Sequence, residues 1–208
     1  MRHEWGLGYK PIKNILRILE AKGVRVFSLA ENCREIDACS FWSDDTAFIL
    51  LKTGVSSERL RFDMAHELGH LVLHRHAAPS GREAENEANQ FASYFLMPEE
   101  SLRQHRVRTW SVDSLLSKKT IWGVSISALA YRLHRVGYIS DWHFKSLNIE
   151  FQRRGYKTNE PNPIRHEQSK VLEVVLGRMR DLGMPICYMA NQIGAQKEKI
   201  GTALDDFT

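Results

Sequence analysis

The stretch HELGH, residues 66–70, determines how the rest of the chain is interpreted, because it is an HExxH pentapeptide within a predicted helix. Apolar or small residues at helical spacing extend this helix from a serine cap at residue 56 or 57 to about residue 76. Positions four apart share one face of a helix, so His66 and His70 can bind the same ion, and Glu67 leans over it. The pentapeptide therefore predicts two metal ligands and a general base.

A second helix, predicted for residues 83–96, supplies the missing ligand. A hydrolytic zinc centre holds three protein ligands and one open position for water. Glu85 can complete a set of two histidines and one glutamate, and Asn89, four residues later on the same face, can hydrogen-bond a ligand. Glu83 and Glu87 are expected to point elsewhere. Imidazole and carboxylate ligands without a thiolate favour Zn²⁺, and the spacing leaves Mn²⁺ and Co²⁺ open as alternatives.

The predicted chemistry is metal-assisted attack of water on a carbonyl group. A bound zinc ion would lower the pKa of its water to about 7, and Glu67 would take the proton and pass it to the leaving amine. His74, one turn beyond His70 on the same face, is the candidate that stabilises the oxyanion. Alternatively, His74 and His76 are exposed histidines at a helix end, where the helix dipole favours them.

A competing interpretation of the pentapeptide is two polar residues on a helix surface, since a bare HExxH also occurs by chance. Apolar neighbours argue against it, because they would partly bury the two histidines without a reason. Gly69 also argues against it, because glycine costs a helix interior about 1 kcal/mol. That cost is explained if another segment must pack closely at this position.

The segments HELGHLVLHRH (66–76) and EAENEANQFASYFLMP (83–98) resemble the ImmA/IrrE family of zinc metallopeptidases. The resemblance covers about residues 10–160, and the last 45 residues only loosely. It implies a compact gluzincin-like fold with His66, His70 and Glu85 as zinc ligands and Glu67 as the catalytic base. Members of this family are associated with cleaving helix-turn-helix repressors or antitoxins, so the implied partner is a protein substrate that itself binds DNA.

The chain departs from the family members that carry an amino-terminal helix-turn-helix domain. Its first ten residues, MRHEWGLGYK, are too few to form such a domain. Either a separate partner supplies the DNA-binding domain, or the sequence is a partial chain. The same ten residues contain no apolar signal core, and the longest apolar run in the chain is Ala47–Leu51, so the expected location is the cytoplasm.

Positive charge is concentrated in residues 101–158, where eleven Lys and Arg residues against three acidic residues give a net charge of +8. The whole chain carries +4, so this stretch favours an acidic partner such as DNA. The competing interpretation is that these bases lie on ordinary solvated helix faces. A basic stretch alone does not identify a nucleic-acid-binding protein.

Residues 122–137 contain a turn and a second helix in the manner of a helix-turn-helix, with Arg132, His134 and Arg135 expected to be exposed. This segment would contact DNA or dock a repressor. Packing inside the protein is the favoured alternative, because apolar residues at helical spacing form a core stripe: Ile126, Leu129, Ala130 and Leu133.

The predicted fold class is α+β, with a mostly helical zincin-like peptidase domain, a small β-sheet and helical carboxy-terminal segments. Strands are expected at residues 24–29, 37–42 and 46–52. Further helices are expected at residues 11–22, 109–122, 125–135, 140–154, 167–181 and 195–205, with another short helix starting at Pro185. The predicted domains are 1–122 for the peptidase, 123–158 for the basic helix-turn-helix-like segment and 164–208 for the carboxy-terminal region, after a linker at 158–163.

Two functions follow as hypotheses. The first is a zinc endopeptidase that cleaves a specific repressor or antitoxin and so relieves repression. The second is a non-catalytic DNA-binding or partner-sensing regulator on a peptidase fold. The complete set of ligands and base favours the enzyme, because a binding module has no use for a general base beside an open metal site. A hydrophobic content of 43% and a charged content of 26% are ordinary for a globular protein and argue against intrinsic disorder.

Overall fold

The computed structural model of the chain describes residues 1–29, 37–52, 54–75 and 81–183. These residues contain eight helices and three strands, which confirms the predicted α+β class with a small sheet. The chain divides into two compact units. The helical unit comprises Met1–Lys13 and Ser56–Arg165, and the sheet unit comprises Asn14–Val55 and His166–Thr208. The helices predicted at residues 195–205 and from Pro185 lie outside the described residues.

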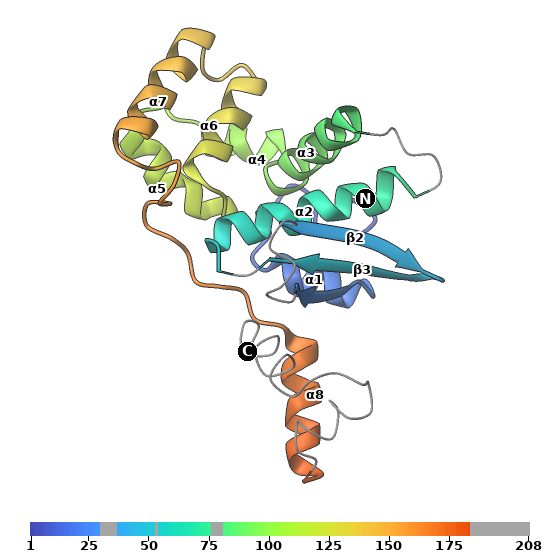
Figure 1. Cartoon of the computed structure of the whole chain (residues 1–208). Helices are drawn as coiled ribbons and strands as arrows, with labels where there is room; N and C mark the ends of the chain where they lie inside the picture. The colour runs from blue at the N-terminus through green and yellow to red at the C-terminus, as the bar shows by residue number, and fades with distance from the viewer. Residues whose placement is uncertain (30–36, 53, 76–80, 184–208) are drawn as a thin grey trace. The chain divides into compact units, whose positions relative to one another are not determined.

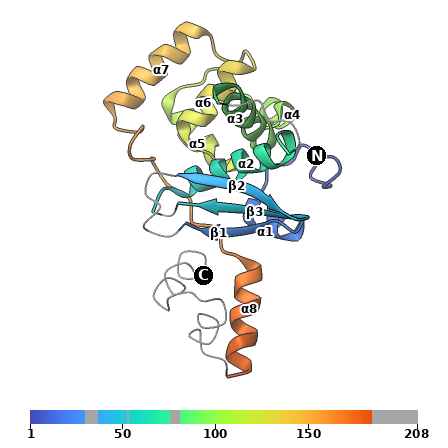
Figure 2. The same ribbon diagram turned by 45° about the vertical axis from the view of Figure 1, so that its right-hand side comes forward.

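The sheet unit is built on three short strands with β3 in the middle (Figure 2). The strands are β1 (Arg25–Ser28), β2 (Ala38–Ser43) and β3 (Thr46–Leu51). β1 runs parallel to β3, and β2 pairs with β3 in an antiparallel hairpin. Alternate residues of β3 are buried because successive side chains of a strand point to opposite faces. The three strands lie within two residues of their predicted bounds.

Two helices complete the sheet unit, namely α1 (Ile15–Ala21) and α8 (Lys170–Asp181). The Glu20 carboxylate of α1 accepts hydrogen bonds from the backbone N–H of Lys170, at 3.0 Å, and from the Ser169 hydroxyl. Ser169 is also the N-cap of α8, so Glu20 and Ser169 together satisfy donors at the start of that helix. These contacts join two helices that are far apart in the sequence.

The helical unit contains α2 (Ser57–Leu73), α3 (Arg82–Leu96), α4 (Glu99–Gln104), α5 (Val112–Trp122), α6 (Ile126–Arg135) and α7 (Asp141–Arg153). Four of these helices begin after a serine whose hydroxyl accepts a backbone N–H three residues later: Ser56, Ser111, Ser125 and Ser140. The sequence pattern does not predict the short helix α4, because Pro98 indicates the end of α3 and is also the N-cap of α4. Among the described residues, no helix has the length and apolar character needed to cross a membrane.

Helices α2 and α3 lie side by side, as Figure 1 shows, and they pack closely at Gly69. A Cβ atom at Gly69 would lie 3.2 Å from the Cα of Ala88 and 3.1 Å from the ring of Phe91. The missing side chain therefore lets the α3 backbone approach α2 closely. This contact is the one that the sequence indicates, since a glycine in a helix interior otherwise only weakens the helix.

The start of α2 is held by a buried guanidinium. Arg61 is 2% exposed and donates to the carbonyls of Ile12 at 2.7 Å, Gly123 at 2.9 Å and Trp122 at 3.1 Å. Burial lowers the pKa of Arg61 to about 10, and the nearby Glu58 opposes this shift, so Arg61 stays charged at neutral pH. A buried charged group is stable only when it has hydrogen-bond partners, and the three carbonyls provide them for Arg61.

A second buried cluster joins α2 to α5 and to the segment after α7. Lys119 is fully buried, and its ammonium lies 2.5 Å from Glu58 and 3.0 Å from Glu160. Glu160 also accepts the backbone N–H of Ile126 at 3.0 Å, and Glu58 accepts that of Ile164 at 3.1 Å. Through these contacts α2, α5, α6 and the segment after α7 share one polar network.

The expected exposure of Arg132 is wrong. Arg132 is 2% exposed, donates to the Met97 carbonyl at 3.0 Å and lies 3.9 Å from the centroid of the Tyr94 ring. His134 is partly exposed and contacts Asp141, while Arg135 is exposed as expected. The apolar stripe of α6 is buried, which agrees with the packing interpretation: Ile126, Leu129, Ala130 and Leu133.

Candidate metal centre

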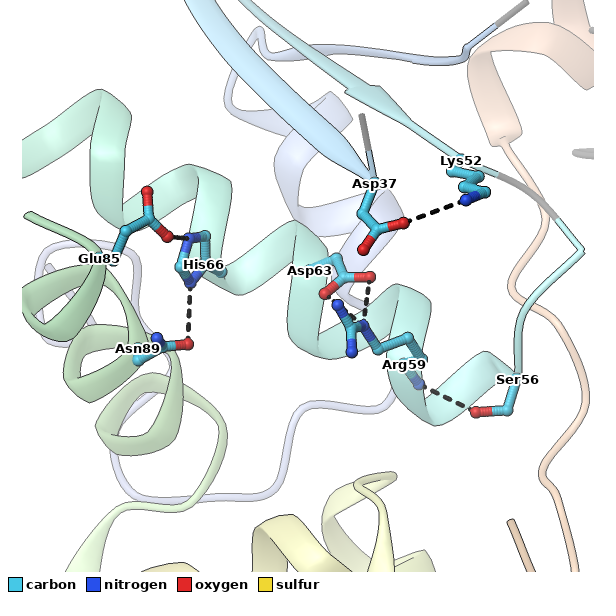
Figure 3. A network of polar contacts seen from close by, with 8 residues as sticks. All are labelled: Asp37, Lys52, Ser56, Arg59, Asp63, His66, Glu85 and Asn89. Carbon is cyan, nitrogen blue, oxygen red and sulfur yellow. Dashed lines mark hydrogen bonds and ion pairs between the residues drawn. The ribbon is translucent and has the colours of Figure 1, made fainter. Parts of the chain in front are cut away.

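Three predicted ligand side chains converge between α2 and α3. The Nε2 atoms of His66 and His70 lie 3.0 Å apart, and the Glu85 carboxylate lies 3.2 Å from the first and 3.4 Å from the second. Figure 3 shows Glu85 reaching from α3 towards the His66 ring. The three residues form a group whose ligand atoms all lie within 4.8 Å of one another, which is compact enough for one ion.

The spacing of these donor atoms fits a tetrahedral ion. Donor atoms about 2.0–2.1 Å from a central zinc ion, at the corners of a tetrahedron, lie about 3.3 Å apart. The three donor distances of 3.0, 3.2 and 3.4 Å bracket that value. Because the Glu85 side chain is 59% exposed, the cluster is open to solvent, as a centre that must admit water and substrate requires.

Each histidine of the cluster has its other ring nitrogen occupied by a protein group. The Nδ1 of His66 lies 3.1 Å from the Asn89 side-chain oxygen, and the Nδ1 of His70 lies 2.9 Å from the Nδ1 of His74. Figure 3 shows Asn89 on α3, reaching His66 from the side opposite Glu85. With both Nδ1 atoms engaged, the two Nε2 atoms are the ones left available to an ion. Asn89 therefore lies within hydrogen-bond distance of the predicted ligand His66.

The surroundings of His70 favour its neutral imidazole. The pKa of His70 is lowered by burial and by the neighbouring His66, while Glu85 opposes the shift. A histidine must be neutral to bind a metal, so a lowered pKa keeps His70 able to bind one at neutral pH. Glu67, the predicted general base, is buried on α2 directly after His66, with 6% of its surface exposed. Burial shields this carboxylate from bulk water.

His74 lies at the carboxy-terminal end of α2, but its ring faces protein groups. Its side chain is 7% exposed, and its Nε2 lies 3.0 Å from the Glu87 carboxylate of α3. Glu87 was expected to point away from the site, and no signal in the sequence would have placed it against His74, because this contact depends on how two helices pack. His76 lies outside the described residues.

A peptidase family model described as the IrrE N-terminal-like domain matches residues 19–134. The matched stretch contains all of α2 and α3 and therefore every residue of the cluster. A search of the curated proteins found no match.

Proposed function

Since the chain belongs to the IrrE N-terminal-like peptidase family, we propose that it is a zinc-dependent endopeptidase that hydrolyses one bond in a specific protein substrate. The observation that carries the proposal is the convergence of His66, His70 and Glu85 at donor distances suited to a tetrahedral ion. The donor set of two imidazoles and one carboxylate, without a thiolate, favours zinc over manganese or cobalt.

In the proposed mechanism, His66, His70 and Glu85 would hold the zinc ion, which when bound would supply Lewis-acid activation for the attack of water on the scissile carbonyl. Glu67 accepts a proton from the attacking water, whose oxygen bonds to the carbonyl carbon. Glu67 then delivers that proton to the amide nitrogen as the carbon–nitrogen bond breaks. The burial of Glu67 suits this role, because a base shielded from bulk water retains the proton between the two transfers.

The proposed substrate is a helix-turn-helix repressor or antitoxin in the cytoplasm, so that cleavage relieves repression. The resemblance of residues 66–98 to the ImmA/IrrE peptidases supports this substrate class. A narrow specificity is expected, because a general protease in the cytoplasm would destroy the proteins of its own cell.

DNA contact through residues 101–158 is the weaker proposal. Four of the eleven bases in this stretch already have partners within the protein: Lys119 and Arg132 are buried, and the exposed Arg153 and Arg154 pair with Glu150. The other bases include exposed arginines such as Arg103, Arg106, Arg108 and Arg135. A regulator that acts through DNA alone predicts affinity that falls steeply with salt and does not depend on Glu67.

The test is zinc content together with cleavage. We expect about one zinc per chain in protein purified without a chelator, and none in His66→Ala or Glu85→Gln, because three ligands are needed. Glu67→Gln should keep its zinc and no longer cleave repressors and antitoxins from the same cell. Cleavage is measured by mass spectrometry of the new chain termini that it produces. Glu83→Gln is the matched control, since it removes an exposed charge from the same first turn of α3.

Two outcomes would contradict the proposal. A folded wild-type chain that takes up no zinc, even when zinc is added, would remove the metal centre. Cleavage by Glu67→Gln at the wild-type rate would contradict the proposed mechanism, because it would show that the reaction needs no general base at that position.

A further inference from the structure

His74 is attached to His70 by both its backbone and its side chain. The backbone N–H of His74 donates to the His70 carbonyl at 3.0 Å, as the last hydrogen bond of α2. The two Nδ1 atoms lie 2.9 Å apart, and on its far side the His74 ring meets Glu87 at 3.0 Å. The side chains of Glu87, His74 and His70 therefore form a continuous chain of polar contacts that ends at the predicted ligand His70.

The hydrogen positions along this chain follow from the proposed metal centre. A neutral His70 that binds an ion through Nε2 carries its hydrogen on Nδ1 and donates it to the Nδ1 of His74. His74 then carries its own hydrogen on Nε2 and donates it to the Glu87 carboxylate, which accepts. Only this arrangement makes every contact a hydrogen bond while leaving the His70 Nε2 lone pair for the ion.

We propose that His74 and Glu87 are positioning residues that fix which nitrogen of His70 binds the metal and how its ring is oriented. The inference rests on the proposed zinc centre. It gives His74 a different role from the oxyanion contact expected from the sequence, because both ring nitrogens of His74 are engaged by His70 and Glu87.

The two ligand histidines are supported differently. His66 is held by the neutral amide of Asn89, whereas His70 is linked through His74 to the negative charge of Glu87. A carboxylate at the end of such a chain strengthens an imidazole as a ligand. His70 is therefore expected to be the stronger donor of the two, and its affinity for zinc to depend on residues that never touch the ion.

The experiment compares four variants by chelator competition for zinc and by the absorption spectrum of the Co²⁺-loaded protein. His74→Leu should raise the dissociation constant for zinc by on the order of 10–100-fold and alter the Co²⁺ spectrum. His74→Asn should recover most of the affinity, because its side-chain oxygen can accept the hydrogen of the His70 Nδ1. Glu87→Gln should raise the constant by less, since the amide oxygen still accepts from His74. Glu83→Gln should leave both measurements unchanged.

A purely structural role for His74 would give different results. The inference is overturned if His74→Leu keeps the wild-type affinity and spectrum, or if His74→Asn binds zinc no better than His74→Leu. If His74→Leu fails to fold, Glu87→Gln becomes the deciding variant, because Glu87 is 46% exposed and its replacement should not disturb folding. A wild-type affinity for zinc in Glu87→Gln would then refute the positioning role. Failure of the proposed function is recognised separately, since the wild-type protein and Glu83→Gln would then also bind no zinc.

Discussion

Replacing Gly69 by alanine tests whether close packing of α2 on α3 positions the side chains of the candidate metal centre. The added Cβ would lie 3.2 Å from the Cα of Ala88 and 3.1 Å from the Phe91 ring. The ring can turn, but the Ala88 atom belongs to the backbone, so α3 itself must move away by a few tenths of an ångström. Glu85 and Asn89 lie on that helix on either side of Ala88 and must move with it.

Two opposing terms set the magnitude. Alanine gains about 1 kcal/mol over glycine in a helix interior, and overpacking a close contact costs about 1–3 kcal/mol. We therefore expect Gly69→Ala to lower the free energy of unfolding by about 0–2 kcal/mol. The displaced carboxylate and amide should raise the dissociation constant for zinc by on the order of tenfold, as for changes to groups that support metal ligands.

The assay is urea unfolding of the zinc-free protein together with chelator competition for zinc. The matched control is Gly177→Ala in α8, where the added Cβ would have no neighbour within 4 Å, and where we expect a gain of about 0.4–1 kcal/mol. If Gly69→Ala gains as much stability as Gly177→Ala and binds zinc like the wild type, then close packing at Gly69 does not position the ligands.

Three further predictions concern the buried network of the helical unit. Lys119→Met should lower the free energy of unfolding by about 3–5 kcal/mol in urea titrations, because it leaves Glu58 and Glu160 as buried carboxylates without their cation. Gly123→Ala should destabilise the chain in the same assay and more than Gly69→Ala, since it combines a φ of +61° with a Cβ 2.6 Å from the Arg61 Nε. Burial raises the pKa of Glu160 above its usual 4.5, so the folded chain binds more protons than the unfolded chain between 4.5 and the raised value. The difference in free energy of unfolding between the wild type and Glu160→Gln should therefore fall as the pH rises through that interval. Unfolding curves at several pH values measure it, and a difference that does not change with pH would contradict the prediction.

The parts of the site that depend on one helix could be predicted from the sequence. His66 and His70 are four apart, so the geometry of α2 alone brings their rings together. Predicting that Glu85 and Asn89 belong to the site required one further condition, namely that α3 packs against α2. Gly69 indicated that another segment packs closely against α2 at that position. Where the sequence pattern and the packing agreed, the expected residues and the observed cluster coincide.

The parts that depend on the register between helices could not be predicted. The contact between Glu87 and His74 depends on the position of α3 along the axis of α2. The spacing of apolar residues within one helix does not determine that position. The exposure expected for Arg132 is wrong for a related reason. A charged residue beside an apolar stripe looks exposed, yet the Met97 carbonyl at the end of α3 and the Tyr94 ring give its guanidinium buried partners.

The hydrogen bonds of Arg61 also limit how α2 can move. Arg61 lies five residues before His66, about 7.5 Å along the axis of α2, and holds the carbonyls of the turn between α5 and α6. Any motion of that turn must carry α2 with it or leave a buried charged donor without its acceptors, at a cost of about 1.5–3 kcal/mol for each bond. A partner that shifted the α5–α6 turn would therefore also strain the helix that carries His66 and His70, because the Arg61 hydrogen bonds couple the two.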